Sequence, residues 1–279
     1  MANKTKLVPI PSTNMVPERD FGKRPILECV GLGITFGGLK AVEDFNIAIG
    51  RTEIAGLIGP NGAGKTTVFN LLTKVYQPTH GTILLDGRDT HGMDTAHVNR
   101  AGIARTFQNI RLFPSLTVEE NVAVGMDTQM KYNMASGILR LKNYWKEEKL
   151  VHDRCLELLS LFHMEGLANV KAGSLPYGAQ RRLEIVRALA TGPSLLLLDE
   201  PAAGMNPSET AELMENIRKI RDTFHIAVLL IEHDMNLVME VCEGICVLNF
   251  GRIIAKGTPE EIQANPAVVE AYLGKQKEA

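Results

Sequence analysis

The chain has 279 residues, of which 45% are hydrophobic and 22% charged, and these ordinary values exclude a chain that is disordered throughout. Its 30 basic and 32 acidic residues give a net charge of -2, which removes the electrostatic reason to expect a nucleic-acid-binding protein. No uncharged apolar stretch is long enough to predict a membrane-spanning helix, so we expect any link to a membrane to run through a partner.

Two further features limit the interpretation before any motif is considered. Residues 1–25 are rich in proline and mildly basic, and they lack the continuous apolar core of a signal peptide, so we expect a flexible leader there. The four cysteines form no Cys-x-x-Cys pair, and we interpret them as reduced, buried thiols rather than as a metal site. They are Cys29, Cys155, Cys242 and Cys246.

The first half of the chain begins with strand patterns and then changes character. Strands are predicted at residues 27–36, 45–49, 53–58 and 82–85. Strand patterns fade from about residue 93 to 171, where the helical spacing of apolar residues in 150–162 predicts a mainly helical insert.

The second half returns to strands that alternate with helices. All-apolar runs at residues 195–198, 226–231 and 245–248 are typical of parallel strands buried on both faces. Helices are predicted from Pro207, after a capping box that begins at Thr258, and from Pro266.

A phosphate-loop motif lies between the strand predicted at 53–58 and an apolar segment at 68–72. Residues 59–67 read GPNGAGKTT and satisfy the pattern G-x-x-x-x-G-K-[ST]. Gly62 and Gly64 let consecutive N–H groups point at phosphate oxygens, and the positive end of the following helix adds to the attraction. We expect Lys65 to reach the β- and γ-phosphates and Thr66 to ligate Mg²⁺. The predicted cofactor-binding residues of this loop are Gly59, Pro60, Asn61, Gly62, Ala63, Gly64, Lys65, Thr66 and Thr67.

An acidic pair follows the apolar run at 195–198. Asp199 is expected to hold Mg²⁺, usually through water, and Glu200 to orient or deprotonate the attacking water. His233 follows the next apolar strand. Because ligands gather at the carboxyl ends of parallel strands, we expect His233 to contact the γ-phosphate and orient the water. One phosphate loop and no internal repeat predict a single ATP-hydrolysing core.

Together these motifs resemble the ATP-binding subunit of ABC transporters over residues 27–273. The segments RTFQNIRLFPSLTVEENV, YGAQRRLEIVRAL, LDEPAAGMNP and LLIEHDMNLVMEVC are similar to the larger ATPase subunit of high-affinity branched-chain amino acid importers. The resemblance implies an α/β fold of the ABC ATPase type: a P-loop core with a mainly parallel sheet, flanking helices, an antiparallel β portion and a helical insert. It also implies ATP and Mg²⁺ as cofactors. We expect an ATP-binding core at 26–95 and 175–275, and a helical subdomain at 96–174 that ends at the signature loop.

The resemblance assigns roles to residues that carry little signal alone. It implies that Phe36 stacks on adenine, that Gln108 senses Mg²⁺ and water, and that His233 is a switch histidine. The family's signature loop falls at residues 175–182, where backbone N–H groups face the γ-phosphate bound by a second, opposite core. The groups expected to do this belong to Tyr177, Gly178 and Ala179.

This sequence departs from the family pattern in the signature loop. Pro176 stands where the family has serine, and it has neither a hydroxyl nor an N–H to donate. Ala179 replaces the usual glutamine, and Asn206 replaces the more common aspartate of the loop after Glu200. Two such loops would close a homodimer weakly, so we predict a heterodimer with a second, similar ATPase.

The expected partners also include two membrane permease subunits and, indirectly, an extracytoplasmic substrate-binding protein, but no nucleic acid. These partners place the chain at the cytoplasmic face of the membrane. Five apolar residues lie near Gln108, and two interpretations stay open: they form a groove for a permease helix, or they pack inside the insert. They are Phe107, Ile110, Leu112, Phe113 and Leu116.

Several alternatives to a branched-chain amino acid importer remain. A urea or short-chain amide importer uses a closely similar subunit, and an exporter ATPase of the lipopolysaccharide-extraction type shares the single-core format. A soluble ABC ATPase acting on DNA or ribosomes is disfavoured, because the chain lacks a second core, sustained heptads and a basic patch.

Overall fold

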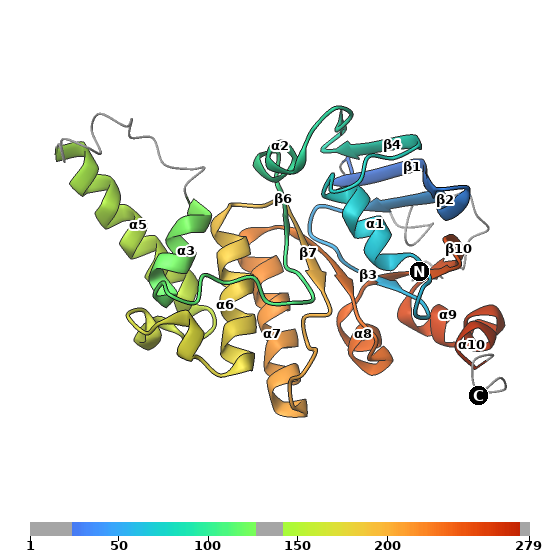
Figure 1. Ribbon diagram of the computed structural model, residues 1–279. Helices are drawn as coiled ribbons and strands as arrows, with labels where there is room; N and C mark the ends of the chain where they lie inside the picture. Colours follow the sequence, from blue (N-terminus) through green and yellow to red (C-terminus); the bar gives the residue numbers. More distant parts are fainter. Residues whose placement is uncertain (1–23, 127–141, 274–279) are drawn as a thin grey trace.

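The computed structural model describes residues 24–126 and 142–273, in which two β-sheets are flanked by helices (Figure 1). Almost all of the predicted leader therefore lies outside the described residues. The larger sheet has six strands in the order β10-β9-β3-β8-β7-β6, and its neighbours are parallel except for the β9–β10 pair. These strands are β3 (Ile54–Ile58), β6 (Ile103–Arg105), β7 (Leu195–Asp199), β8 (Ala227–Ile231), β9 (Gly244–Asn249) and β10 (Arg252–Gly257).

The smaller sheet is antiparallel, with the order β2-β1-β4-β5. Its strands are β1 (Leu27–Phe36), β2 (Leu39–Ile49), β4 (His80–Leu85) and β5 (Arg88–Asp89). Asp86 and Gly87 form the turn between β4 and β5 with φ angles of 48° and 68°, a conformation that favours the Asp-Gly pair. The mainly parallel sheet and the antiparallel portion predicted from the sequence are thus confirmed.

The parallel strands are buried on both faces because their apolar residues alternate between two hydrophobic clusters. In β7, Leu196 and Leu198 belong to the cluster that contains helices α6 and α7. Leu195 and Leu197 belong to the other cluster, with α1 and the antiparallel sheet. All five residues of β3, β7 and β8 are buried, which explains why these strands read as continuous apolar runs.

Helices cover the sheet and form the part of the molecule that carries the signature sequence. Figure 1 shows α3 and α5 side by side with α6 on one side of the sheet, and α9 and α10 at the opposite end. The helices are α1 (Lys65–Leu72), α2 (Thr95–Arg100), α3 (Val118–Met126), α5 (Lys142–Ser160), α6 (Tyr177–Ala190), α7 (Pro207–Phe224), α8 (Met235–Val241), α9 (Pro259–Gln263) and α10 (Pro266–Leu273). Two short 3₁₀ turns, η2 (Glu165–Leu167) and η3 (Ala172–Ser174), connect α5 to α6.

The structure differs from the sequence prediction at the edge of the helical segment. Residues 103–105, which the prediction places in that segment, form β6 and pair in parallel with β7. Three residues are too few to show a strand period, so this edge strand had no detectable pattern. The capping box at Thr258 is confirmed, because its hydroxyl accepts from the Glu261 N–H and the Glu261 carboxylate accepts from the Thr258 N–H.

The cysteines are free and buried, as predicted. Within residues 24–126 and 142–273, no group of three or more His, Cys, Asp or Glu side chains is placed to hold a metal ion. Over the same ranges, no helix has the length and apolar character needed to cross a bilayer.

Candidate active site

The phosphate loop joins the end of β3 to the start of α1, as the motif requires. The Lys65 ammonium folds back into the loop and donates to the carbonyl oxygens of Gly59 and Pro60 at 2.7 and 3.1 Å. Gly59 has a φ of 153°, and a Cβ there would lie 2.0 Å from the Leu248 carbonyl oxygen. Gly64 ends the loop with a φ of 107°. The backbone path of the loop therefore depends on glycine at both ends.

A hollow of about 680 Å³ opens in front of this loop. It brings together most of the predicted site: residues 61–67 of the phosphate loop and three side chains from distant segments, Gln108, Glu200 and His233. Its walls consist of Leu39, Lys40, Ala41, Asn61, Gly62, Ala63, Gly64, Lys65, Thr66, Thr67, Gln108, Glu200, His233, Phe250 and Gly251.

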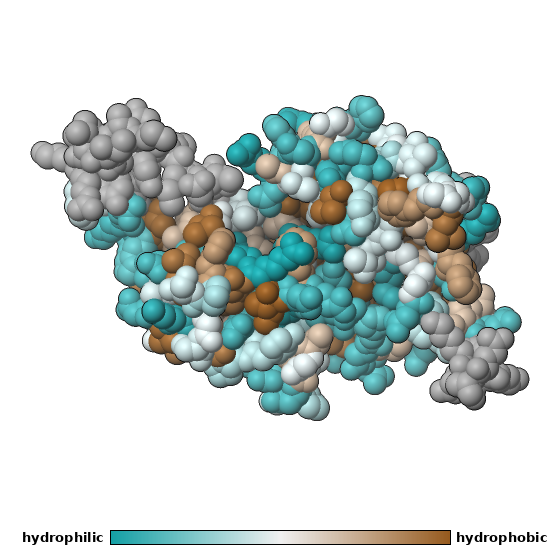
Figure 2. Space-filling view, in the orientation of Figure 1, coloured by the Kyte–Doolittle hydropathy of each residue, from teal (hydrophilic) through white to brown (hydrophobic). Residues whose placement is uncertain are grey.

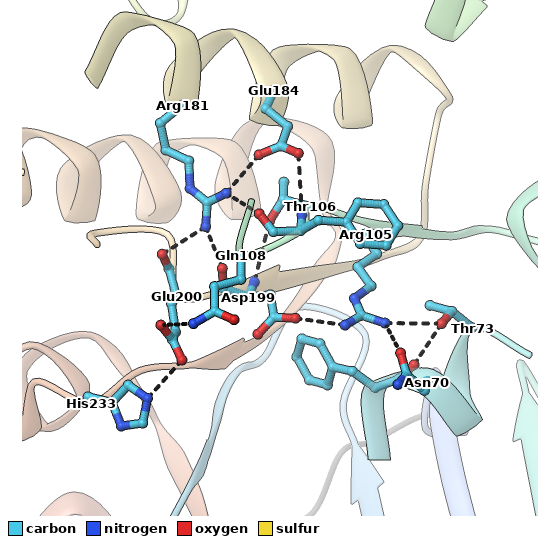
Figure 3. Close-up of polar contacts among 12 residues, drawn as sticks. Asn70, Thr73, Arg105, Thr106, Gln108, Arg181, Glu184, Asp199, Glu200 and His233 are labelled. Carbon is cyan, nitrogen blue, oxygen red and sulfur yellow. Dashed lines mark hydrogen bonds and ion pairs between the residues drawn. The ribbon is translucent and has the colours of Figure 1, made fainter. Parts of the chain in front are cut away.

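Glu200 is the centre of the polar contacts across the hollow (Figure 3). Its Oε1 lies 2.7 Å from His233 Nε2, and its Oε2 accepts from Gln108 Nε2 at 2.9 Å. The Glu200 side chain is only 16% exposed, whereas that of His233 is 48% exposed. The three residues predicted to be catalytic thus meet at one carboxylate beside the phosphate loop. A carboxylate held on both oxygens is oriented to accept a proton from a water in the hollow.

Asp199 does not line the hollow in this structure, because its carboxylate is paired with Arg105. The Arg105 guanidinium lies 2.7 Å from Asp199 Oδ2, and both side chains are almost fully buried. The same guanidinium donates to Asn70 Oδ1 at 2.8 Å and lies between the rings of Phe69 and Phe107. Arg105 therefore connects Asp199 to α1, the helix that begins at Lys65 (Figure 3).

Glu232 is another buried carboxylate at this edge. Its two oxygens accept the backbone N–H groups of Ala202 and His233 at 2.8 and 3.2 Å. Burial raises the pKa of Glu232, while these two backbone hydrogen bonds oppose the rise. Its position fixes the backbone of His233 relative to the loop that follows Glu200.

The signature residues lie at the start of α6, outside the hollow. Tyr177 begins the helix and is exposed, whereas Gly178 and Ala179 are buried. The Tyr177 ring packs against Gly204 of the loop after Glu200, where a Cβ would lie 3.0 Å from its Cε1 atom. The first N–H groups of a helix have no partner within the helix, so this end can receive an anion from another molecule.

Asn206 has a structural role that the comparison with the family pattern did not reveal. It caps α7 with a capping box: its Oδ1 accepts from the Glu209 N–H, and the Glu209 carboxylate accepts from the Asn206 N–H, both at 3.0 Å. Asparagine caps helices about as well as aspartate, so this departure leaves the local structure intact.

Phe36 is not among the residues that line the hollow. Its ring contacts Tyr76 edge-on, with a centroid distance of 5.2 Å. Leu39 and Phe250, which had no predicted role, line the hollow instead and are 72% and 83% exposed.

A second hollow, of about 360 Å³, lies between α2, α3 and α6 beside the loop that carries Gln108. Of the five apolar residues near Gln108, only Phe113 lines it and is exposed, at 46%; the other four are half-buried. Figure 2 shows hydrophobic next to hydrophilic side chains over α3 and α6. This second hollow, called the groove below, is lined by Asn99, Ala104, Arg105, Arg111, Phe113, Val124, Gly125, Glu184, Arg187, Ala188 and Thr191.

The charged residues of this groove were missed from the sequence, since single arginines in a helix or loop form no motif. Arg187 lies 5.6 Å from the Phe113 ring and Arg111 lies 3.9 Å from the Phe107 ring. Burial lowers the pKa of Arg187 from its usual high value. The carboxylate of Glu184, which also lines the groove, does not pair with Arg187. It accepts hydrogen bonds from the N–H groups of Phe107 and Arg111 and forms an ion pair with Arg181.

Comparison with known proteins assigns this architecture to a class. The ABC transporter family profile matches residues 42–203, and that of the branched-chain amino acid ATP-binding cassette transporters matches residues 252–278. A solved ATP-binding cassette of an ABC transporter, in its ADP conformation, superposes with a TM-score of 0.78 at 29% identity, over 90% of this chain and all of that one.

Two relatives define the group within this class. The high-affinity branched-chain amino acid transport ATP-binding proteins BraF of Pseudomonas aeruginosa and LivG of Escherichia coli are each 47% identical over 251 residues. Each match covers 90% of this chain and 98% of the relative. The chain belongs to the ABC transporter family, among the ATP-binding proteins of branched-chain amino acid transport, and is an ATP-hydrolysing subunit.

Proposed function

We propose that this chain powers a membrane importer of branched-chain amino acids by Mg²⁺-dependent ATP hydrolysis. The convergence of Gln108 and His233 on the Glu200 carboxylate beside the phosphate loop supports the hydrolytic part. The transported class is supported by what BraF and LivG are named for and by the match at residues 252–278.

The proposed roles of the site residues follow from their donor groups. Lys65 and the N–H groups of the phosphate loop bind the phosphates, and Glu200 orients and deprotonates the attacking water while His233 and Gln108 hold it in place. Mg²⁺ prefers oxygen ligands, and the Thr66 hydroxyl and the Gln108 side-chain oxygen, which line the hollow, would hold it. Asp199, whose carboxylate is paired with Arg105, would reach the ion through water. When bound, this ion would neutralise charge that develops on the phosphates.

We assign the groove beside Gln108 to a short cytoplasmic helix of a permease subunit. Phe113 and Val124 supply an exposed apolar surface, and Arg111 and Arg187 add positive charge beside it. A helix that carries apolar residues and a carboxylate would complement both features. Leu116, which the sequence grouped with Phe113, is half-buried and does not line this groove.

The assembly proposed is a heterodimer with a second ABC ATPase, bound to two permeases at the cytoplasmic face of the membrane and served by an extracytoplasmic binding protein. Pro176 precedes α6 without a side-chain cap, so this signature end has fewer donors than one with serine. Light scattering on the purified Glu200→Gln variant with ATP tests this: we expect a monomer, and a stable homodimer at micromolar concentration contradicts the proposal.

Transport by the complete assembly tests the function itself. Co-expression with a permease pair, a second ATPase and a binding protein, followed by reconstitution in vesicles, should give ATP-dependent uptake of labelled leucine but not of urea. Phe113→Ser should reduce uptake about tenfold or more while basal ATP hydrolysis stays near the wild-type rate, because an exposed contact is lost without core packing.

The matched control is Val170→Ser, which removes an exposed apolar side chain of the helical part that does not line the groove. Uptake of urea in place of leucine would refute the proposed substrate class. If Phe113→Ser lost stability along with hydrolysis, the groove would belong to the core rather than to a partner.

A further inference from the structure

Arg181 is a fully buried cation whose hydrogen bonds join three segments that are far apart in the sequence. It lies on α6, one turn after Tyr177, and its side chain is 0% exposed. Its guanidinium donates to the carbonyl oxygens of Glu200, at 2.7 Å, and Asp199 (Figure 3). It also donates to those of Pro201, at 3.4 Å, and Phe107.

Burying the positive charge of Arg181 is unfavourable unless hydrogen-bond acceptors and an opposite charge surround it, and both are present here. Glu184 Oε2 lies 2.7 Å from the guanidinium, and the four carbonyl oxygens satisfy its other donors. A guanidinium presents its five N–H groups in one rigid plane, so it fixes the relative positions of the groups that accept from it. A lysine at this position would keep the charge but lose that geometry.

The backbone conformation of Glu200 is one that other groups must hold in place. Glu200 has a φ of 49°, a left-handed conformation that residues with a side chain rarely adopt. Its N–H donates to the Ile231 carbonyl at 2.9 Å, and its own carbonyl accepts from Arg181. The conformation that turns the Glu200 carboxylate toward the hollow is therefore held on one side by β8 and on the other by Arg181.

The same pair on α6 holds the loop that carries Gln108 on both sides of that residue. Arg181 binds the Phe107 carbonyl, and Glu184 Oε1 accepts the N–H groups of Phe107 and Arg111 at 3.4 and 3.3 Å. Two of the three residues proposed to act on the water are thus bound to one helix: Gln108 through its loop and Glu200 through its backbone.

We propose that Arg181 is a positioning residue for hydrolysis, which sets the Glu200 carboxylate and the Gln108 loop relative to the start of α6. Because Tyr177 opens the same helix, a nucleotide held by a second core against that end moves Glu200 through Arg181. This last step rests on the proposed dimer. The positioning itself does not.

The experiment compares two changes of the clamp, which consists of Arg181 and Glu184, with one control in the isolated ATPase. Arg181→Met together with Glu184→Met removes both charges at similar volume, so that no unpaired charge stays buried. Arg181→Lys keeps the positive charge and leaves Glu184 in place, but it loses the planar set of five N–H donors. Arg154→Met is the matched control, since Arg154 forms the same kind of i,i+3 pair, with Glu157 at 2.5 Å, between exposed side chains of α5 that do not line the hollow.

We expect both clamp variants to bind a fluorescent ATP analogue within about twofold of wild type and to lose kcat by about tenfold to a hundredfold, the scale of a small misplacement of a reacting group. The Arg154→Met control should retain kcat within about twofold. In a Glu200→Gln background, the clamp changes should lower the residual rate by a clearly smaller factor than in the wild type, because one of the two groups they position, the Glu200 carboxylate, is already gone.

Two results would overturn the proposal. One is a clamp variant that folds, judged by its circular dichroism and thermal transition, and hydrolyses ATP at the wild-type kcat. The other is an equal loss in the wild-type and Glu200→Gln backgrounds, which would show that Arg181 does not act through Glu200. If the double Met variant does not fold, Arg181→Lys decides between the same outcomes. Neither measurement involves a permease or a transported substrate, so failure here leaves the proposed transport function to its own test.

Discussion

The phosphate loop and Glu200, the residue that follows β7, line the same hollow, but they are held in place in different ways. The loop is one continuous segment whose shape comes from its own glycines and whose lysine bonds its own carbonyls. Glu200 instead depends on side chains from three other segments, Gln108, Arg181 and His233. Nucleotide binding is therefore a local property of this sequence, whereas hydrolysis is a property of the assembled fold.

The largest effects should separate these two properties. Lys65→Ala should abolish nucleotide binding, because it removes the charge that faces the β- and γ-phosphates. Glu200→Gln should keep binding and reduce hydrolysis by about 10²–10⁴-fold, the contribution of a general acid–base residue. Equilibrium binding of a fluorescent ATP analogue and release of phosphate measure the two separately. Hydrolysis at the wild-type rate by Glu200→Gln would remove Glu200 from the mechanism.

The same contrast explains what the sequence predicts and what it does not. The phosphate loop, the acidic pair and the strands that carry them were predicted because each is a continuous pattern of residues 59–67 or 195–200. The role of Gln108 came only from resemblance to a family, whereas His233 was also expected from its position after a parallel strand. Arg105, Arg181 and Glu232 were missed, since each acts on backbone or side chains up to 94 residues away and no local spacing records such a contact.

Buried charge alone does not mark a functional group in this fold, and Lys256 shows the difference. It is 0% exposed, pairs across β9–β10 with Cys246, and donates to the Asn46 carbonyl at 3.0 Å. Burial lowers its pKa to about 8 from the model-compound value of 10.5. Among the described residues, Lys256 forms no hydrogen bond with a residue that lines the hollow, whereas Arg181 binds the Glu200 carbonyl.

The sign of the resulting pH dependence follows from this lowered pKa. The unfolded chain binds more protons than the folded chain between about pH 8 and 10.5, so the stabilising contribution of Lys256 is present at high pH and is lost as the pH falls through 8. The free energy of unfolding of the wild type, relative to Lys256→Met, should rise by about 2–3 kcal/mol from pH 7 to pH 10. The Cys246 thiol, whose pKa burial raises to about 12, stays protonated over this range.

Urea unfolding of the two proteins at several pH values measures that difference. A constant difference from pH 7 to pH 10 would mean that Lys256 keeps its ordinary pKa in the folded chain. Hydrolysis by folded Lys256→Met at pH 7 should match wild type, in contrast to the clamp variants of α6.

The smallest effects should come from the aromatic side of the hollow, at Phe250, where we expect the nucleotide base to bind. Resemblance to the family assigns the adenine contact to Phe36, yet Phe250 lines the hollow while Phe36 packs on Tyr76. Phe250 is 83% exposed with a φ of 44° in the β9–β10 turn, an uncommon combination for a large aromatic residue. A ring held at the mouth of the hollow in this way can stack on a base or ribose that enters it.

Aromatic contacts of this kind contribute about 0.5–1.5 kcal/mol, so Phe250→Ala should weaken ATP binding about two- to tenfold and leave kcat unchanged. Phe250→Tyr keeps the ring and serves as the control, and Phe36→Ala measured alongside it shows how the contact is shared between the two rings. Inorganic tripolyphosphate has no base. The inhibition constant of tripolyphosphate, measured by competition with the ATP analogue, should therefore be unchanged in Phe250→Ala. Lys65→Ala binds no analogue, so its loss of tripolyphosphate binding is measured directly by calorimetry, and the two variants separate the base contact from the phosphate loop. Loss of tripolyphosphate competition in Phe250→Ala would instead show that the turn supports the loop itself, through the Gly251 N–H that donates to the Ala63 carbonyl at 2.8 Å.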